Sequence, residues 1–555
     1  MFSFWEVLGG GREREVSVLS CETFAWCLRE RVVSVLCCET FAWCLVYYLS
    51  LVLCCFIFPD FLLINLICIF FLLTREPLVQ CEDRISNLPS NLIGQILSSL
   101  PTKTAIATSV LSKRWKQFWT LVTSLDFDDK LMLHCRKSIR AALQMSFASF
   151  VDRVLERVSC VDKFRLKCCQ SYDVSHANAW VAALIKYRIK ELNLSIPVKH
   201  STDHVLPRHL FSCRTLVVLK LGTKFMLNVP ASVCLPSLKI LHLDSVKFSD
   251  DDSVKRLLVG CPMLDELGMN ECVGKDVCVI HICAPVLTKL RYRREKKNYL
   301  WGTAEVSEYK IVIDTPALLY LELIDYVADV YLVMNLRNIV KAYIRIAEQY
   351  DETNSKAITD LLMGISEVQC LHLYNDCTEA VQKIDSELPI FHNLTSLVLS
   401  AGYVGWEWLS QLLAKSPCLE SLVFEEGYHI EFDRDEYDEE DDNKGDDKRL
   451  HWNPPQNVPS CLLLNLKVIM FVNFQGDDGD LNMVEYFLRN AEVLEKLIIQ
   501  TNGTVGKCFD MTAAAFAEHQ LEVTMKLLML PRGSKTCQIE FVILRHNLGG
   551  SVSPC

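Results

Sequence analysis

The 555-residue sequence lacks the motifs that mark the common enzyme classes. It has no G-x-S-x-G nucleophile turn, no H-E-x-x-H zinc-binding helix and no set of protein-kinase motifs. The run Asn502–Lys507 contains glycine and lysine without the spacing of a phosphate-binding loop, and Cys508 stands where that loop needs serine or threonine. We therefore expect no catalytic residues, no cofactor and no enzymatic activity.

The cysteines lack the spacing of a metal site. There are 26 of them, but no C-x-x-C pairs occur, and scattered cysteines are typical of buried, reduced thiols in an intracellular protein. The nearest approach to a ligand cluster is Cys272, Cys278, His281 and Cys283. On a strand, His281 and Cys283 would share one face and Cys278 would point to the other. We expect no metal site.

The charge distribution shows no basic face. The formal net charge is −11, and the stretch Glu425–Asp447 alone holds 13 acidic and 2 basic residues, so the remainder is balanced. This balance argues against nucleic acid as a partner. The acidic stretch cannot bury enough apolar area to fold alone, so we expect residues 425–450 to form a disordered loop. A docking strip for a basic partner is the alternative.

The most informative stretch that is present is Asp83–Trp119. Apolar residues between Leu88 and Leu100 recur mostly at steps of three and four, which predicts one face of an amphipathic helix. A second short helix is expected after Pro101, and a third after Ser112, with two tryptophans on one face. Such a small module has too little interior for these apolar residues. We therefore expect a protein partner to cover part of its apolar face.

This stretch resembles an F-box. The resemblance is carried by Leu88-Pro89, by the runs Leu92–Ser98 and Leu100–Lys103, and by Ser109–Trp115 with Trp119. It implies docking on the Skp-type adaptor of a cullin–RING ubiquitin ligase. The residues expected to supply the adaptor surface and its supporting core are Leu88, Pro89, Leu92, Ile93, Ile96, Leu97, Leu100, Val110, Leu111, Trp115 and Trp119. Gly94 and Gln95, on the same helix, are expected to tolerate substitution.

A repeated template follows, with apolar residues at the first, fourth and sixth of six positions. Its copies begin at Val161, Ile189, Leu216, Leu238, Leu264, Leu287, Leu318, Val368, Leu394 and Leu419. The spacing is that of leucine-rich repeats, in which each copy is a short strand of a curved parallel solenoid. The concave face suits a protein substrate. Solvent-facing positions expected there are Lys220, His242, Asp244, Arg291, Glu322, His372 and Ser400.

The C-terminal part carries two more copies, at Leu466 and Leu494, with a helix between them. These pieces resemble the FBD region that follows leucine-rich repeats in plant F-box proteins. The span 83–541 as a whole resembles the plant F-box/FBD/leucine-rich-repeat family. The expected fold class is therefore α/β, with a helical F-box (81–129), a repeat solenoid (130–424), the acidic loop (425–450), an FBD cap (451–541) and a tail (542–555).

Residues 1–80 form a hydrophobic extension that matches none of these patterns. Residues 12–28 recur as residues 29–45 with 15 of 17 positions identical. The almost wholly apolar run Leu45–Leu73 is long enough to cross a bilayer, although Pro59 and Asp60 interrupt it. Three interpretations are open: a membrane anchor, an extension packed on the rest, or sequence absent from the mature protein.

The sequence thus predicts a non-catalytic substrate-recognition subunit of an SCF-type cullin–RING E3 ubiquitin ligase. The F-box would bind the Skp-type adaptor and through it cullin, and the repeats would bind an unknown protein substrate. We expect a nuclear or cytoplasmic protein, or a membrane protein if residues 45–73 are genuine. The alternatives are a membrane-tethered repeat scaffold without a role in ubiquitin transfer, and a receptor whose concave face also holds a small molecule.

Overall fold

The structure is a computed structural model of the chain. It describes residues 87–132, 140–169, 172, 174–197, 204–222, 225–272, 279–294, 310–325, 330–346, 352–374, 388–400, 406–425, 457–474, 476, 478–502 and 513–544. The chain forms two compact units, one of Met1–Val122 with His134–Arg136 and one of Thr123–Leu133 with Lys137–Cys555. Residues 1–80 and the acidic stretch 427–448 lie outside the described residues.

The described part of the first unit, residues 87–122, consists of short helices, as the sequence predicts. They are α4 (Ser90–Ser98), α5 (Thr102–Ala107), the 3-10 turn η2 (Thr108–Val110), α6 (Trp115–Phe118) and the 3-10 turn η3 (Trp119–Leu121). Pro89 and Pro101 occupy the N-cap positions of α4 and α5, where their extended backbone ends the preceding segment. The hydroxyl of Ser112 accepts a hydrogen bond from the Trp115 backbone N–H at 3.3 Å, and this bond stabilises the start of the third helix.

The second unit is organised by one sheet of fifteen strands, all of them parallel. In spatial order the strands are β1 (Ser124–Asp128), β2 (Lys163–Lys167), β3 (Glu191–Ser195), β5 (Val218–Gly222), β7 (Ile240–Asp244), β9 (Glu266–Asn270), β11 (Lys289–Arg294), β13 (Tyr320–Asp325), β15 (Lys341–Ile346), β16 (Cys370–Tyr374), β17 (Ser396–Ser400), β18 (Ser421–Phe424), β19 (Val468–Val472), β20 (Lys496–Asn502) and β21 (Gln538–Leu544). The spatial order follows the chain order, which is the arrangement of a solenoid.

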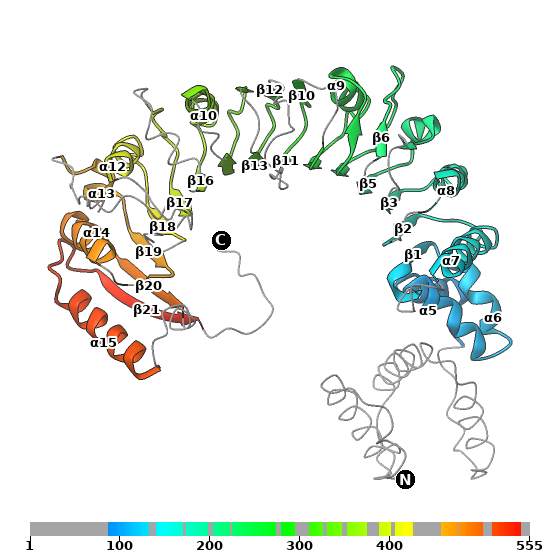
Figure 1. Ribbon diagram of the computed structural model, residues 1–555, viewed down its shortest axis with the longest axis horizontal. Helices are drawn as coiled ribbons and strands as arrows, with labels where there is room; N and C mark the ends of the chain where they lie inside the picture. Colours follow the sequence, from blue (N-terminus) through cyan, green and yellow to red (C-terminus); the bar gives the residue numbers. More distant parts are fainter. Residues whose placement is uncertain are drawn as a thin grey trace, which may run out of the picture. The chain divides into compact units, whose positions relative to one another are not determined.

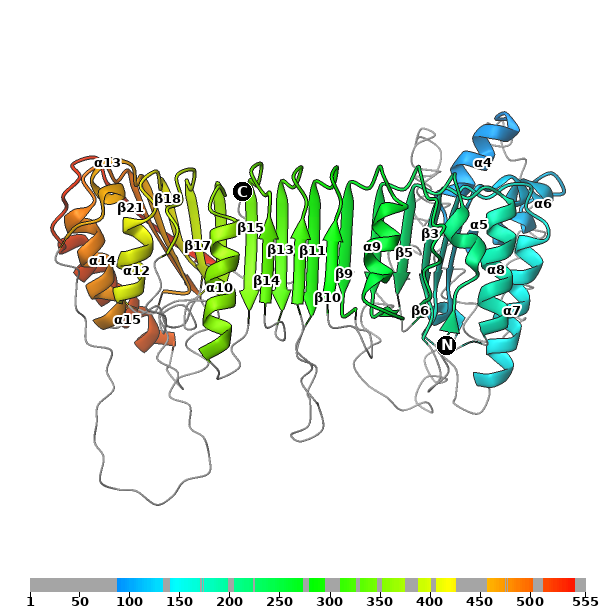
Figure 2. The same cartoon turned by 90° about the horizontal axis from the view of Figure 1, so that it is seen from above.

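Helices cover the outer side of this curved sheet and leave its inner side to the strands (Figures 1 and 2). They are η4 (Asp129–Met132), α7 (Arg140–Leu155), α8 (Val174–Lys186), η6 (Arg208–Ser212), α9 (Asp252–Val259), α10 (Glu352–Gly364), α12 (Trp406–Ala414), α13 (Ser460–Leu464), α14 (Asp478–Asn490) and α15 (Ala513–Met529).

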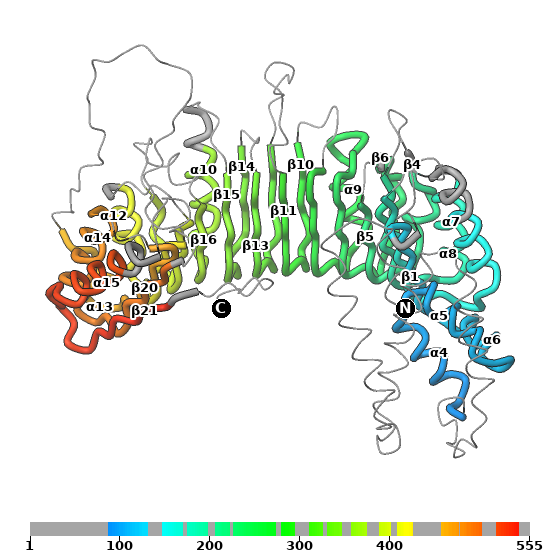
Figure 3. Tube along the Cα trace, turned by 60° about the horizontal axis from the view of Figure 1, so that its bottom comes forward, coloured from blue at the N-terminus to red at the C-terminus, as the bar shows by residue number. Residues whose placement is uncertain are grey.

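In the middle of the solenoid, strands take the place of helices on the outer side. The strands β10 (Val279–Cys283), β12 (Lys310–Asp314) and β14 (Val330–Met334) pair in parallel and continue the outer row between α9 and α10 (Figure 3). A smaller outer sheet joins β4 (His204–Val205), β6 (Phe225–Leu227) and β8 (Lys247–Phe248). The outer segments of these repeats are strands, and the sequence accordingly shows no helical period there.

The solenoid core consists of the template positions of the repeats. All three apolar positions are buried in each of the twelve copies that the sequence shows, from Val161 to Ile499. The structure adds a copy that the sequence pattern missed, formed by Ile339, just before β15, and by Ala342 and Ile344 on β15. Alanine at the middle position weakens the leucine signal, but the side chain is 1% exposed like its neighbours.

The C-terminal region extends the same sheet rather than forming a separate layer. Strand β19 pairs directly with β18, so the chain leaves the sheet after Phe424 and returns to the neighbouring position. Strand β1, within the span 81–129 that the sequence assigns to the F-box, belongs to the sheet as well. At the far end, α15 still exposes Leu521 and Met529, so the described residues do not fully cover the apolar end.

No helix in the described part of the chain is long and apolar enough to span a membrane. The run 45–73, on which the membrane interpretation depends, lies outside that part.

Candidate functional site

The F-box unit has an inner core that supports its helices. Ile93 and Leu97 of α4 are at most 1% exposed, and Trp115 and Trp119 are buried with them. The rings of Trp115 and Phe118 meet edge to face with centroids 5.7 Å apart. Four of the eleven residues predicted for adaptor binding therefore form the supporting core of this unit.

The same unit also presents apolar side chains to solvent. The exposed fractions are 40% for Leu92, 49% for Ile96, 83% for Val110 and 43% for Leu111. Leu92 and Ile96 are four residues apart on α4, so they lie on one face of that helix. Pro89 is exposed, and Leu88 and Leu100 are half-buried. A small module that fills its interior and leaves large apolar side chains outside is typical of a protein-binding surface.

The prediction that Gly94 tolerates substitution meets a close contact in the structure. Gly94 is buried on α4, and a Cβ atom there would lie 3.1 Å from the Leu121 carbonyl oxygen and 3.2 Å from the Leu121 Cβ. Glycine lets α4 approach η3 closely. Gln95, the next residue, is exposed and fits the prediction.

The second candidate surface lies on the inner side of the sheet, where β11, β13, β15 and β16 turn alternate side chains away from the core. Residues at matching positions on these strands form rows across the sheet. The rows are Lys289–Tyr320–Lys341–Cys370, Arg291–Glu322–Tyr343–His372 and Arg293–Ile324–Arg345, and Tyr374 lies beside the last. We call this set the β11–β16 face.

Ion pairs fix the arginines of the β11–β16 face. Glu322, whose side chain is 8% exposed, contacts Arg291 Nε at 3.4 Å and also pairs with Arg293. Arg291 Nη1 reaches Glu266 of the neighbouring strand β9 at 2.9 Å. Burial opposes ionisation of Glu266, but the hydrogen bond from His242 and the nearby cations outweigh it, and the pKa of Glu266 is lowered.

An aromatic row crosses the same face. Ring centroids are 5.5 Å apart for Tyr320 and Tyr343, 5.2 Å for Tyr343 and His372, and 4.5 Å for His372 and Tyr374. Lys289 Nζ lies 5.4 Å from the ring centroid of Tyr320, and Arg345 Cζ lies 5.6 Å from that of Tyr374. Burial and the charge of Glu322 raise the pKa of Tyr320 to about 12, so its hydroxyl stays protonated at neutral pH.

Several residues predicted to face solvent on the concave side are instead buried in hydrogen-bonded clusters. His372 is 8% exposed and Ser400 is 3% exposed, and their Nε2 and Oγ atoms lie 2.6 Å apart. Both contact the carboxylate of Glu425, whose pKa is lowered by the hydrogen bond from His372 more than burial raises it. Lys220 and His242 are half-buried and Asp244 is exposed. Sequence alternation places these side chains on the correct face but cannot show their depth.

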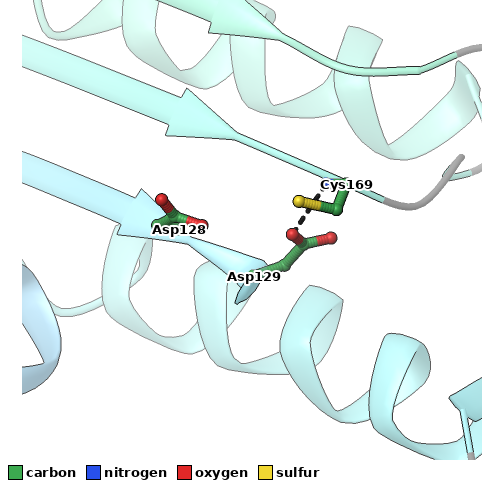
Figure 4. A group of neighbouring side chains, drawn as sticks. All are labelled: Asp128, Asp129 and Cys169. Carbon is green, nitrogen blue, oxygen red and sulfur yellow. Dashed lines mark hydrogen bonds between the residues drawn. The ribbon is translucent and has the colours of Figure 1, made fainter. Parts of the chain in front are cut away.

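One group of possible metal ligands occurs among the described residues, at the carboxyl end of β1 (Figure 4). Atoms of Asp128, Asp129 and Cys169 lie within 4.8 Å of one another. The buried carboxylate of Asp129 already accepts hydrogen bonds from the Cys169 backbone N–H at 2.7 Å and the Tyr172 hydroxyl at 3.2 Å. Burial and the charge of Asp129 raise the pKa of the Cys169 thiol. The arrangement is explained as an anchor for the loop after β2.

The described members of the second cluster considered as metal ligands, Cys272, His281 and Cys283, are divided between a buried position before β10 and one face of β10. Cys272 is buried, and its thiol donates to the Leu243 carbonyl at 3.4 Å. His281 and Cys283 share a face of β10, as predicted, and Cys278 lies outside the described residues.

Comparison with family models identifies three regions of the chain. The F-box domain matches residues 85–126, the leucine-rich repeats of FBD-associated F-box protein At5g56370 match residues 177–329, and the FBD region matches residues 453–499. These matches cover the helical unit, the middle of the solenoid and the strands β19 and β20.

Full-length relatives occur in Arabidopsis thaliana. The chain is 30% identical over 498 residues to F-box/LRR-repeat protein At2g42730, covering 84% of this chain and 100% of the relative. It is 32% identical over 463 residues to F-box/FBD/LRR-repeat protein At4g26340, covering 80% of this chain and 99% of the relative. Together with the helical unit and the solenoid, this similarity shows that the chain belongs to the plant F-box/LRR-repeat family.

Proposed function

We propose that this protein is a substrate-recognition subunit of an SCF-type cullin–RING E3 ubiquitin ligase. The F-box binds the Skp-type adaptor, and through it cullin, while the inner side of the solenoid binds a protein substrate. The role is non-catalytic. The protein holds its substrate near ubiquitin that is activated for transfer, and it thereby raises the effective concentration of the reacting groups. A nuclear or cytoplasmic location is consistent with this role.

The observation that carries the proposal is the outer apolar surface of the F-box unit. Leu92, Ile96, Val110 and Leu111 are exposed although they are large and apolar, and the core of the unit is complete without them. Burying such side chains against a partner is favourable at roughly 25 cal/mol per Å² of apolar surface. The F-box similarity of residues 85–126 supports a Skp-type adaptor as that partner.

The test is binding of a purified Skp-type adaptor to the full-length chain and to the variants Ile96→Asp and Val110→Asp. We expect each variant to weaken binding by about tenfold or more, since a charge would be buried in an apolar interface. The matched control is Val259→Asp, because Val259 is 73% exposed at the end of α9 in the other unit.

Two results would contradict the proposal. One is no binding of the adaptor to the parent chain, and the other is equal binding by the parent and by both F-box variants. Circular dichroism of all variants verifies that a loss of binding reflects the surface and not unfolding.

A further inference from the structure

Among the described residues, the β11–β16 face carries an excess of positive charge, which corrects the expectation that the chain has no basic face. Its cations are Lys289, Arg291, Arg293, Lys341 and Arg345, and its one carboxylate is Glu322. Even when the flanking carboxylates Glu266 and Glu425 are included, two positive charges remain in excess. The net charge of the whole chain is −11, which residues 425–447 account for, so the face differs in sign from the chain as a whole.

The side chains of this face are held in place before a ligand arrives. Arg291 and Arg293 are fixed by Glu322, Lys289 and Arg291 lie over Tyr320, and Arg345 lies over Tyr374. Arginine and tyrosine are the residues that most often dominate binding at protein interfaces, because they combine charge or a hydroxyl with a large apolar surface. Preorganisation lowers the entropy lost on binding.

The dimensions of the face favour a short peptide segment. Neighbouring strands are about 4.8 Å apart, so four strands span roughly 15 Å, the length of about four or five extended residues. Cations line the face on both sides of the central aromatic row, and apolar ring surface lies between them. Carboxylates on an extended chain could reach the cations while a neighbouring apolar side chain covers the rings.

We infer that the β11–β16 face binds an acidic peptide segment, an extended stretch of a protein substrate that carries Asp or Glu side chains beside an apolar or aromatic residue. This inference rests on the proposed function, and it gives the chemistry of the substrate that the solenoid recognises. The surface lies on the side of the sheet opposite the helices (Figure 1).

The test uses the full-length protein and matched pairs of immobilised peptides of about eight residues. One member of each pair carries Asp and Glu next to Tyr or Leu, and the other carries Asn and Gln at the same positions. We expect the acidic members to bind about tenfold more tightly, with a preference that weakens as salt is raised.

The variant is Lys341→Gln with Arg345→Gln, because it removes two cations without touching the arginines that pair with the buried Glu322. We expect it to lose at least fivefold in binding of acidic peptides and to bind the adaptor normally. The control is Lys255→Gln, an exposed lysine of α9 on the outer side of the sheet. Thermal unfolding of each variant verifies that the fold is intact.

Equal binding of acidic and amide peptides, or undiminished acidic-peptide binding by the folded double variant, would overturn the inference. Tighter binding of a single-stranded RNA oligonucleotide that displaces the acidic peptides would also overturn it. The outcome for the proposed function is read separately. Acidic-peptide binding without adaptor binding would retain the peptide site and reject the ligase role, whereas the reverse result would retain the ligase role alone.

Discussion

Gly94 lies so close to Leu121 that a Cβ atom on residue 94 would come within 3.1 Å of the Leu121 carbonyl oxygen. The contact joins α4 to η3 and closes the F-box unit. We expect Gly94→Val to destabilise this unit by about 2 kcal/mol, because overpacking of a well-packed core costs about 1–3 kcal/mol. Hydrogen exchange of the α4 amides measures the effect, with Gln95→Ala as the control. Unchanged protection of α4 in the valine variant would show that Leu121 moves aside freely.

The division of the F-box residues into core and outer surface predicts two kinds of variant. Leu97→Ala should lower the free energy of unfolding of the F-box unit by about 2–5 kcal/mol, since it leaves a cavity in the core. Ile96→Ala, which truncates an exposed side chain on the preceding residue, should leave stability within about 0.5 kcal/mol and weaken adaptor binding. Chemical unfolding and adaptor titration are the two measurements. The division is incorrect if both variants change stability equally.

The hydrogen bonds of the Asp129 carboxylate predict that its substitution lowers stability and that added metal leaves stability unchanged. Asp129→Asn should lower the free energy of unfolding by about 1–3 kcal/mol, because one amide oxygen replaces two acceptors that face the Cys169 N–H and the Tyr172 hydroxyl. Asp128→Asn is the milder control, since Asp128 is only half-buried and accepts from the Lys130 N–H. Thermal unfolding with and without added Zn²⁺ is the measurement. A large zinc-dependent rise in Tm that Asp129→Asn abolishes would show a metal site instead.

The contact of Glu425 with His372 predicts a dependence of stability on pH. The pKa of Glu425 lies below its usual value of 4.5, so its stabilising contribution is present above pH 4.5 and is lost as the pH falls from there through the lower folded-state pKa. Glu425→Gln should therefore lower the free energy of unfolding by about 1 kcal/mol near neutral pH. Its difference from the parent should shrink below pH 4.5.

Urea unfolding at several pH values measures the effect of Glu425→Gln. The control is Glu420→Gln, because Glu420 pairs with Lys467 at the surface, where an ion pair contributes about 0–1 kcal/mol. A difference between Glu425→Gln and the parent that grows as the pH falls would contradict the assigned sign.

Sequence periodicity predicted the elements that repeat locally. Leu371 and Leu373 could be placed in the core of β16 because alternation along a strand decides which face a side chain takes. The helices of the F-box unit could be placed for the same reason, from apolar steps of three and four. β15 was missed because Ala342 carries too little apolar signal, and β12 and β14 were missed because no regular pattern marks them.

The candidate surfaces were predicted only in part. The eleven F-box residues form one set in the sequence, but packing divides them into buried residues such as Leu97 and exposed ones such as Ile96. Glu322 was expected to face solvent, yet its side chain is covered by arginines from β11, about 30 residues earlier in the chain. Depth and charge pairing depend on cross-strand neighbours, which a local pattern does not specify.

The sequence by itself determined the family, the order of F-box, repeats and FBD region, and the apolar residues that form the solenoid core. These follow from local spacing, since each strand and helix repeats at its own period. Only the tertiary structure decided which F-box residues remain exposed, how closely Gly94 approaches Leu121, and how Lys289, Tyr320 and Lys341 come to lie side by side. The physical reason is that parallel stacking brings together residues that are far apart in the chain.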